Sequence, residues 1–391
     1  MTTAPAGELA IAALNDERAA WLALALTPKL GPRRILRAIE RTGSAAGILE
    51  LRLTELEGLQ FPAESVQFIA DGQARVTADQ QIDELVKTGG TFLTYTDEAY
   101  PERLREIFDP PALLWLRGSA RLLAEPSIAV VGTRHPTPYG SGMAEMLSRD
   151  LAHRGLIILS GMARGIDTSA HKGAIAANRP TVAIWGTGID VIYPKENKLL
   201  AEQIVAGGGT IVSELPLGTF PAPQNFPRRN RILSGMSIGV LVIEAAEYSG
   251  TRVTARCALE QNRDVYAVPG NVTTKNAWGP NTLIKQGAKL TATWEDVWED
   301  LPSQVRLQLE EREGLASNAP SAASLFSEEP LPPHQARLLD ILRPDEALQI
   351  DEIMEKLEAE LSSSEIFTAL FELELAGRIR QLPGKNYVKS F

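Results

Sequence analysis

Six short and almost continuous apolar runs, separated by amphipathic segments, constrain the fold of this chain more than any other feature. Each run is rich in Val and Ile, which is typical of parallel strands buried on both faces. Helical segments between such strands predict a Rossmann-like, doubly wound α/β sheet that is mostly parallel. The expected strands are 127–133, 156–161, 181–188, 209–215, 238–245 and 264–270.

The residues before this sheet predict a helical unit and an extension of the sheet. Residues 10–70 have helical periodicity, and two of the expected helices are joined by the turn "TPKLGPRR" at 27–34. This turn resembles a helix-hairpin-helix or sterile-alpha-motif-like (SAM-like) module, and a plain helical bundle is the alternative. The runs "TFLTY" and "ALLWLRG", between 91 and 118, predict two short strands that extend the sheet.

The residues after the sheet predict a linker and a winged helix. Residues 301–330 are rich in Ser, Ala, Pro and Glu, which is typical of a flexible linker. Three expected helices and a hairpin in "GRIRQLPGKNYVKS" then match the winged-helix pattern. The predicted domains are a helical domain at 1–78, an extended Rossmann-like domain at 79–300, the linker at 301–330 and the winged helix at 331–391.

Charge is distributed unevenly along the 391 residues, whose net charge is −10. Residues 127–290 hold 17 Lys and Arg against 11 Asp and Glu, so this segment carries +6. The remainder carries −16, and the winged helix within it carries −4. A basic sheet domain indicates a polyanionic ligand. The acidic winged helix favours a protein contact or a regulatory role over reading of duplex DNA.

The chain shows no feature of a secreted or membrane protein. Its single cysteine, Cys257, excludes a disulfide framework and suits a reducing compartment. The first residues lack the pattern of a secretory signal, and no run approaches the roughly 18 apolar residues needed to span a bilayer. We therefore expect a cytoplasmic protein with no membrane partner.

Glycines, hydroxyls and cations follow five of the predicted strands, at the edge where ligands of open parallel sheets bind. Glycine lets a ligand approach the backbone, and a helix N-terminus, such as the one expected near Tyr139, attracts anions. Together these turns predict an extended phosphate or polyanion site. Its candidate residues, in strand order, are Gly132 and Arg134; Gly161, Arg164 and Gly165; Lys195; Arg228, Arg229, Asn230 and Arg231; and Ser249, Gly250 and Thr251.

Several of these turn residues have a purely structural alternative. A glycine after a strand can serve only a tight turn, and Arg134 alone can be a surface ion-pair partner. We expect Asp167 to cap a helix rather than act as a catalytic carboxylate, and His171 to be packed rather than a general base. The arginine cluster at 228–231 favours anion binding, because no acid occurs from 215 to 243.

The motifs of common nucleotide enzymes and metal sites do not occur in this sequence. There is no G-x-x-x-x-G-K-[ST] loop, and "VVGTRHPTPYG" departs from the G-x-G-x-x-G dinucleotide fingerprint. There is also no Cys/His metal spacing and no G-x-S-x-G elbow. The sequence therefore predicts binding rather than catalysis, with no catalytic residues, no metal and no cofactor.

A series of motifs within residues 127–290 resembles, in order, the bacterial DNA-processing protein A (DprA, also called Smf) family. The helical unit and the winged helix resemble the flanking domains of this family more loosely. The motifs are "VVGTRHPTPYG", "SGMARGIDTSAHKGA", "GTGIDVIYPKEN", "SELPLG" followed by "FPRRNRILSGMS", "VIEAAEYSGTRVTA", "AVPGN" and "GPNTLIKQGA".

The resemblance implies a protein that binds single-stranded DNA in natural transformation, protects it and loads the recombinase RecA onto it. It also implies a homodimer formed through the Rossmann-like core and no established enzymatic activity. Phosphate-contacting positions of the family fall on Arg134, on Lys195 and on the "FPRRNR" segment at 226–231. Aromatics near the turns are few, so we expect modest base stacking; they are Tyr139, Tyr193, Phe226 and Tyr248.

Two other functions stay open at this point. One is a nucleotide-processing enzyme of the related phosphoribohydrolase-like class, although its typical "PGGxGT" turn is replaced here by "EAAEYSGTRVTA". The other is a structural adaptor whose core only dimerises. Release of product from nucleoside monophosphates would favour the enzyme, and DNA binding that is insensitive to charge reversal of the arginines would favour the adaptor.

Overall fold

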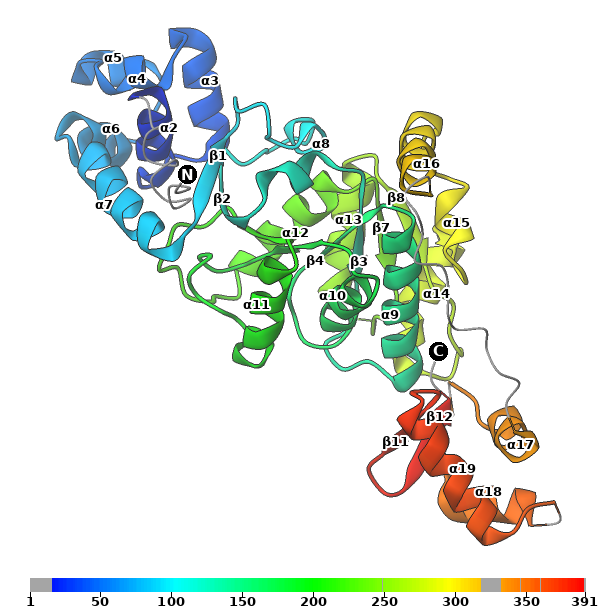
Figure 1. Ribbon diagram of the computed structural model, residues 1–391. Coiled ribbons are helices and arrows are strands. Elements are labelled where there is room, and N and C mark those ends of the chain that lie inside the picture. Colours follow the sequence, from blue (N-terminus) through cyan, green and yellow to red (C-terminus); the bar gives the residue numbers. More distant parts are fainter. Residues whose placement is uncertain (1–15, 248, 318–331, 345, 359, 390–391) are drawn as a thin grey trace.

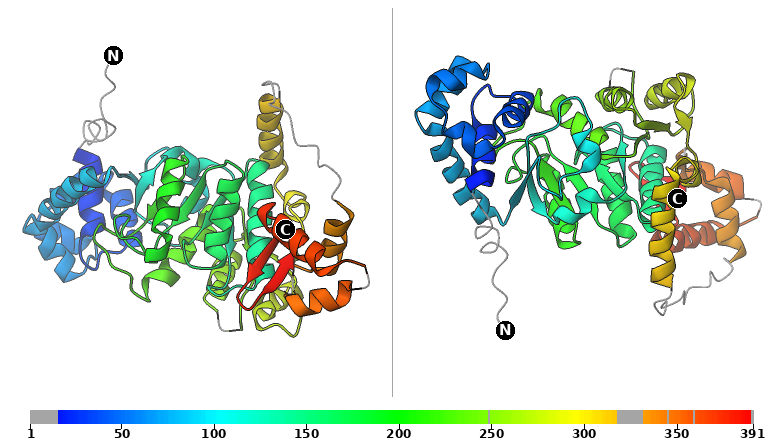
Figure 2. Two further views of the ribbon diagram at one scale, coloured as in Figure 1. Left: turned by 60° about the horizontal axis from the view of Figure 1, so that its bottom comes forward. Right: turned by 90° about the horizontal axis from the view of Figure 1, so that it is seen from above.

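The central element of the protein is a single twisted sheet with helices on both faces (Figures 1 and 2). The computed structural model describes residues 16–247, 249–317, 332–344, 346–358 and 360–389. Within these ranges the sheet has nine strands. They are β1 (Thr91–Thr94), β2 (Leu113–Gly118), β3 (Ser127–Val131), β4 (Ile157–Ser160), β5 (Thr181–Ile184), β6 (Thr210–Ser213), β7 (Gly239–Val242), β8 (Asp264–Ala267) and β9 (Lys289–Leu290).

The strand order is β1-β2-β6-β5-β4-β3-β7-β8-β9, and strands β6 to β9 in this order pair in parallel. The pairs β1–β2 and β2–β6 are antiparallel, so β2 alone runs against the other strands, and β1 and β2 extend one end of the described sheet. The predicted Rossmann-like fold is therefore confirmed. The chain reverses its direction of travel across the sheet at β3, which pairs with β4 on one side and with β7 on the other. This switch point is where open α/β sheets bind ligands.

Side chains that alternate along β3 separate the two helical layers of this domain. Ile128 and Val130 point to one face, and Ala129 and Val131 to the other, because strand side chains alternate with a period of two. The first face is covered by α9 (Pro138–His153) and α10 (Ile166–Ala176), with α11 (Lys198–Ala206) beside them. The second is covered by α12 (Asn225–Met236) and α13 (Thr251–Glu260).

A bundle of helices lies at the β1–β2 end of the sheet (Figure 1). Trp21 of this bundle shares a buried core with Trp115 of β2 and Trp185. Arg18 adds an ion pair with Asp97 at 2.6 Å. The helices are α2 (Asp16–Leu26), α3 (Pro32–Thr42), α4 (Ala45–Leu49), α5 (Leu53–Gly58), α6 (Ala63–Ala70) and α7 (Gln73–Thr88).

Two sequence predictions about this bundle differ from the structure. The expected domain boundary between residues 78 and 79 falls inside α7, which continues to Thr88 and leads directly into β1. The turn expected at 27–34 is shorter, because α3 begins at Pro32 and includes the two arginines that follow it. Proline is favoured in a first helical turn, since the missing N–H has no partner there anyway. Residues 1–15 of the predicted helical domain lie outside the described residues.

The predicted linker is wrong over its first half, because Ser303–Ser317 forms the helix α16. Leu309 on this helix is buried in the core beneath α9. Arg312 also forms an ion pair with Glu125. Burial of an apolar side chain stabilises a helix whose composition alone does not predict it. Residues 318–330 of the predicted linker lie outside the described residues.

Two further helices lie near the end of the sheet domain. Helix α14 (Trp278–Lys285) connects β8 to β9, and α15 (Glu295–Trp298) follows β9.

The C-terminal residues form the predicted winged helix with its own buried core. Helices α17 (Pro333–Ile341), α18 (Ile350–Leu357) and α19 (Ser363–Leu375) pack on a sheet of order β10-β12-β11. The strands are β10 (Leu348–Gln349), β11 (Ile379–Leu382) and β12 (Asn386–Lys389). In the described part of the chain, no helix is both long enough and apolar enough to cross a bilayer.

Candidate nucleic-acid interface

A cleft of about 440 Å³ lies at the switch point, where β3 and β7 end. We call it the carboxyl-edge cleft. It brings together most of the turns that the sequence singled out, from segments more than 100 residues apart. Its lining includes Gly132, Thr133, Arg134, His135, Ala163, Asp167, Phe226, Pro227, Arg229, Asn230, Ser249, Gly250 and Thr251.

Arg134 is an exposed cation at the mouth of this cleft. Its guanidinium lies 5.7 Å from the ring centre of Phe226, and that ring lies 5.6 Å from the ring of Tyr193. Arg134 comes from the turn after β3, Phe226 from the first turn of α12 and Tyr193 from the turn after β5, and the two rings are tilted by 38°. Tyr139 is directed elsewhere, since its hydroxyl donates to the carbonyl of Pro269 at 2.9 Å. The fourth predicted aromatic, Tyr248, lies outside the described residues.

The N-terminus of α13 faces the cleft opposite Arg134. Gly250 is its N-cap, and its first backbone N–H groups are already accepted within the turn: that of Thr251 by the hydroxyl oxygen of Ser249 at 3.1 Å, and those of Arg252 and Val253 by the carbonyls of Ser249 and Gly250. An anion at this end would therefore meet the field of the helix dipole rather than free N–H groups. Gly250 leaves open space where a side chain would stand. The first N–H groups of a helix carry a partial positive charge and attract anions. The structure thus brings the predicted residues Ser249, Gly250 and Thr251 to the same cleft as Arg134 and Asn230.

The N-terminus of α9 does not serve an external anion, contrary to the sequence prediction. Glu244, which follows β7 and is buried, occupies it. The carboxylate accepts the backbone N–H of Thr137 at 2.9 Å and its hydroxyl at 2.5 Å. A side chain at Gly140 would collide with this carboxylate. Sequence reasoning missed this role because Glu244 ends an apolar strand and its partner lies 107 residues earlier.

The turn after β4 is occupied in the same way, by Asp167. Its carboxylate accepts the backbone N–H groups of Gly161 at 3.1 Å and Ala163 at 3.2 Å. Asp167 is therefore a structural acceptor, but it closes the preceding turn rather than capping α10 as the sequence predicted, since the N-cap of α10 is Gly165. Gly161 and Ala163 have no free N–H for a phosphate at this point. The prediction that Gly161 binds phosphate is wrong, and its function is to make room for the guanidinium of Arg229.

Arg229 lines the cleft but is almost buried, with only 7% of it exposed. Its guanidinium donates to the carbonyl oxygen of Ile184 at 2.5 Å. Burial raises the pKa of Asp167 and lowers the pKa of Arg229, and the attraction between the two charges opposes both shifts. Arg229 is thus not the exposed phosphate ligand that the sequence predicted. It supplies positive charge from below the surface.

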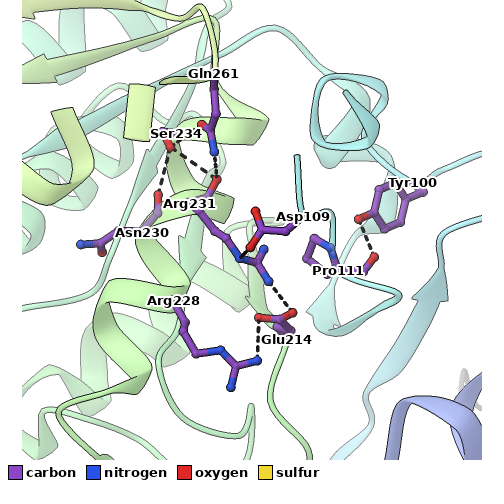
Figure 3. Close-up of polar contacts among 9 residues, drawn as sticks. All are labelled: Tyr100, Asp109, Pro111, Glu214, Arg228, Asn230, Arg231, Ser234 and Gln261. Carbon is purple, nitrogen blue, oxygen red and sulfur yellow. Dashed lines mark hydrogen bonds and ion pairs between the residues drawn. The ribbon is translucent and has the colours of Figure 1, made fainter. Parts of the chain in front are cut away.

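Arg231 is also misassigned by the sequence, because it forms a buried ion-pair bridge (Figure 3). One guanidinium nitrogen lies 2.6 Å from Glu214, and the Nε atom lies 3.0 Å from Asp109. The bridge joins α12 to the turn after β6 and to the segment before β2. Asp109 and Glu214 precede Arg231 by 122 and 17 positions, so the neighbouring sequence gives no sign of this role.

Arg228 is the member of the arginine cluster that reaches solvent. Its side chain is 57% exposed, and its contact with Glu214 is a long one of 3.9 Å (Figure 3). Successive residues of an α-helix point in directions roughly 100° apart. The three arginines of α12 therefore face solvent, the sheet and the segment before β2, respectively, instead of forming one patch.

The remaining predicted residues divide between packing and surface. Gly132 lies against Ile166, and a Cβ atom there would approach to 2.4 Å. Gly165 has a φ of +74°, a conformation that favours glycine. These two glycines therefore have structural reasons to be glycine. Lys195 is exposed at the start of a 3₁₀ turn (Lys195–Asn197), and Arg164 is exposed but forms an ion pair with Glu196.

His171 is packed, as expected, and its surroundings exclude a role as a general base in the cleft. It is fully buried, and its Nδ1 atom lies 2.8 Å from the hydroxyl oxygen of Thr181. That hydroxyl donates to the carbonyl of Ile158 at 2.6 Å, so Nδ1 carries the proton and donates to Thr181. Burial, and secondly the charge of Arg229, lowers the pKa of His171 to about 3.

This depressed pKa predicts that acid weakens folding through His171. In the unfolded chain His171 binds a proton below about pH 6.5, whereas in the folded chain it does so only near pH 3. The free energy of unfolding therefore decreases as the pH falls from 6.5 towards 3. We expect the substitution His171→Asn to remove about 2 kcal/mol of the loss between pH 7 and pH 5. Urea unfolding of both chains at the two pH values measures this difference. Equal losses would contradict a neutral, buried His171.

Comparison with known proteins agrees with the arrangement of this sheet and of the C-terminal residues. Residues 91–302 match the family model described as DNA recombination-mediator protein A, and residues 320–385 match the DprA winged helix domain. Protein Smf of Escherichia coli (strain K12) is 40% identical over 75% of each chain. Protein Smf of Synechocystis is 33% identical over 95% of this chain and 99% of its own.

A solved structure shows a similar fold. The X-ray structure of DNA processing protein A (DprA) from Streptococcus pneumoniae has a TM-score of 0.65 and 31% identity to this chain. The similarity covers 74% of this chain and 99% of the other. The likeness therefore extends well beyond the nine-stranded sheet of the described residues to the elements around it.

Proposed function

The chain belongs to the DNA-processing protein A (DprA, Smf) family, and on that premise we propose that its carboxyl-edge cleft binds single-stranded DNA. The protein is then a mediator that holds a single strand during transformation and recombination and passes it to RecA. In this proposal the phosphates contact Arg134, Arg228 and Lys195 and the N-terminus of α13. The cleft has no catalytic residue.

The observation that carries this proposal is the division of charges at the carboxyl edge. Arg134 and Lys195 are exposed, and among the described residues no carboxylate is paired with either of them. Asp167 and Glu244 in the same region are buried and already accept hydrogen bonds from the backbone. Glu247, in the turn after β7, is exposed but does not line the cleft. An edge with unpaired cations around a cleft whose acid is already hydrogen-bonded attracts a polyanion, and the cleft offers no free base for chemistry.

The shape of the cleft favours a single strand over a duplex. Phe226 lies beside the guanidinium of Arg134, and the ring of Tyr193 lies next to Phe226. Unpaired bases stack on such flat groups, while the bases of a duplex are already stacked on each other. The described cleft contains no protruding helix that could enter a major groove, and its cations are suited to contacts with a flexible backbone.

Binding of labelled oligo-dT across a salt series tests the proposal. We expect the logarithm of the affinity to fall linearly with the logarithm of salt concentration, by about 0.7 for each phosphate contact. A blunt duplex of the same length should bind more weakly. If the chain binds neither DNA form, or prefers the duplex, the proposed function is wrong.

An enzyme of the phosphoribohydrolase-like class remains the alternative function for such a sheet. It needs a carboxylate that is free to act on a bound nucleotide. Among the described residues that line the cleft, the acid is Asp167, and it is committed to two backbone N–H groups. Incubation with nucleoside monophosphates should therefore release no free base; release would favour the enzyme.

RecA loading and dimerisation complete the proposal. Both come from the family resemblance. The matching assay for the first is RecA filament formation, in the presence of single-strand binding protein, on DNA with and without this chain. Light scattering of the full chain measures its mass in solution and so tests the homodimer. We propose that the protein is cytoplasmic, as RecA loading requires.

A further inference from the structure

A second and larger cleft, of about 780 Å³, lies between α3, the first turns of α12 and the last turn of α13. We call it the α3 cleft. Figure 1 shows α3 on the side of the N-terminal helices that faces the sheet domain. The shared core around Trp21, Trp115 and Trp185 holds these helices against the sheet. The cleft is lined by Arg33, Arg34, Arg37, Phe108, Asp109, Pro227, Arg228, Arg231, Cys257 and Glu260.

Three exposed arginines of α3 give this cleft its positive charge. Arg33, Arg34 and Arg37 all lie in the first two turns of the helix, which has no acidic residue in its first turn. Cations near a helix N-terminus are unfavourable, because the helix dipole is positive there. The stability of α3 therefore does not explain these arginines, whereas an anionic ligand would.

The acids of the α3 cleft are engaged by other side chains. Asp109 lies 3.0 Å from the Nε atom of Arg231. Glu260 lies 2.8 Å from Arg256, one turn earlier on α13. In the described structure neither carboxylate is paired with an arginine of α3. These arginines are thus available to a ligand.

An exposed aromatic ring completes the chemistry of a single-strand site. Phe108 is 77% exposed, although phenylalanine is normally buried. The guanidinium of Arg33 lies 3.9 Å from its ring centre. Exposed rings beside arginines form platforms on which bases of single-stranded nucleic acids stack. A folded acidic peptide has no comparable use for such a platform.

The two clefts meet at the start of α12. Pro227 lines both of them, and Arg228 lines the α3 cleft from the next position. A strand that leaves the carboxyl-edge cleft over Pro227 therefore reaches Arg228 first and the arginines of α3 next. Among the described residues that line either cleft, the acids Asp109, Asp167 and Glu260 are each already ion-paired or hydrogen-bonded.

We propose that the α3 cleft is a second segment of one continuous path for single-stranded DNA. Arg33, Arg34 and Arg37 contact phosphates there, and Phe108 stacks on a base. This inference rests on the proposed function, because it extends the same strand beyond the carboxyl-edge cleft. It gives the N-terminal helices a direct part in DNA binding.

The test compares short and long oligo-dT, of about 6 and about 20 nucleotides, because a typical single-strand site of one domain spans 4–16 nucleotides. The variant Arg33→Gln/Arg37→Gln should bind the long oligonucleotide about tenfold more weakly and lower its salt slope by about 1.4. The affinity of this variant for the short oligonucleotide should equal that of the unchanged chain. Phe108→Ala should weaken binding of the long oligonucleotide without changing the slope.

The matched control is Arg41→Gln/Arg121→Gln, which removes the same charge at exposed positions that line neither cleft. It should bind both oligonucleotides normally. If Arg33→Gln/Arg37→Gln behaves like this control while the unchanged chain binds DNA, the α3 path is wrong and the proposed function stands. If the variant loses as much affinity for a duplex as for a single strand, the cleft is not a single-strand path. If the unchanged chain binds no single strand, the proposed function itself fails.

Discussion

The double variant Arg134→Glu/Arg228→Glu should lose about 100-fold or more in affinity for oligo-dT at about 0.1 M salt. Both side chains are exposed; Arg134 lines the carboxyl-edge cleft, and Arg228 lines the α3 cleft next to Pro227, which lines both. Each reversal removes a cation from the phosphate path and introduces repulsion. The salt slope should fall by at least about 1.4, because two phosphate contacts are lost. Fluorescence anisotropy across a salt series measures both quantities.

The control for this experiment is Lys172→Glu/Arg179→Glu. It changes the net charge by the same amount at two exposed positions outside the clefts, and Arg179 precedes β5, at the amino edge of the sheet. We expect at most a threefold loss, due to the long-range field that salt screens within about 10 Å at 0.1 M. If both double variants lose affinity equally, net charge rather than a defined cleft holds the DNA.

The second large effect concerns folding, and its site is Arg231. The substitution Arg231→Met should lower the free energy of unfolding by about 3–5 kcal/mol. It leaves Glu214, whose side chain is 13% exposed, without its partner at 2.6 Å. Loss of one member of a buried ion pair is costly because the other charge stays desolvated. Urea unfolding followed by circular dichroism measures the change, with the slope on urea concentration as a check on two-state behaviour.

Two further variants separate the ion pair from simple loss of packing. The double variant Arg231→Met/Glu214→Gln no longer contains the stranded carboxylate, so it should recover at least about 1 kcal/mol relative to Arg231→Met. Arg228→Met changes the same residue type three positions earlier, where the side chain is 57% exposed, and should cost less than about 0.5 kcal/mol. An Arg231→Met chain as stable as Arg228→Met would show that the bridge contributes nothing.

These two predictions assign different functions to arginines that are adjacent in the sequence. This difference matters for the choice of variants. Charge reversal at Arg229 or Arg231 would destabilise the fold, so a loss of DNA binding could not be attributed to a lost contact. Arg229 is buried against Ile184, and Arg231 is held by Glu214 and Asp109. Arg134 and Arg228 are therefore the appropriate positions for testing DNA binding.

The sheet could be predicted from the sequence because its signal is local. Apolar runs such as 127–133 and 238–245 identify buried strands without knowledge of their neighbours. The winged helix was predicted for the same reason, from three periodic segments and a hairpin. The helix at 303–317 was not predicted, because its composition resembles a linker and its stability comes from burial of Leu309 under α9.

The α3 cleft could not be predicted from the sequence for a related reason. The two arginines after Pro32 looked like part of a turn, and Phe108 lies between the two strands expected within 91–118, where the sequence predicted no binding residue. Only the packing of the helical bundle against the sheet brings α3 to the start of α12. A site between elements about 200 residues apart leaves no local pattern in the sequence.

The sequence by itself determined the class of the fold and the family, and it predicted the edge of the sheet at which we propose the site. It also showed that residues 127–290 carry the excess of positive charge. Only the tertiary structure decided which cations reach a ligand. In α12 the direction of each side chain follows the helix, so Arg228 faces solvent while Arg229 and Arg231 face inward. Their partners are carbonyls and carboxylates from distant segments, and the free energy of a buried charge depends on those partners rather than on its sequence neighbours.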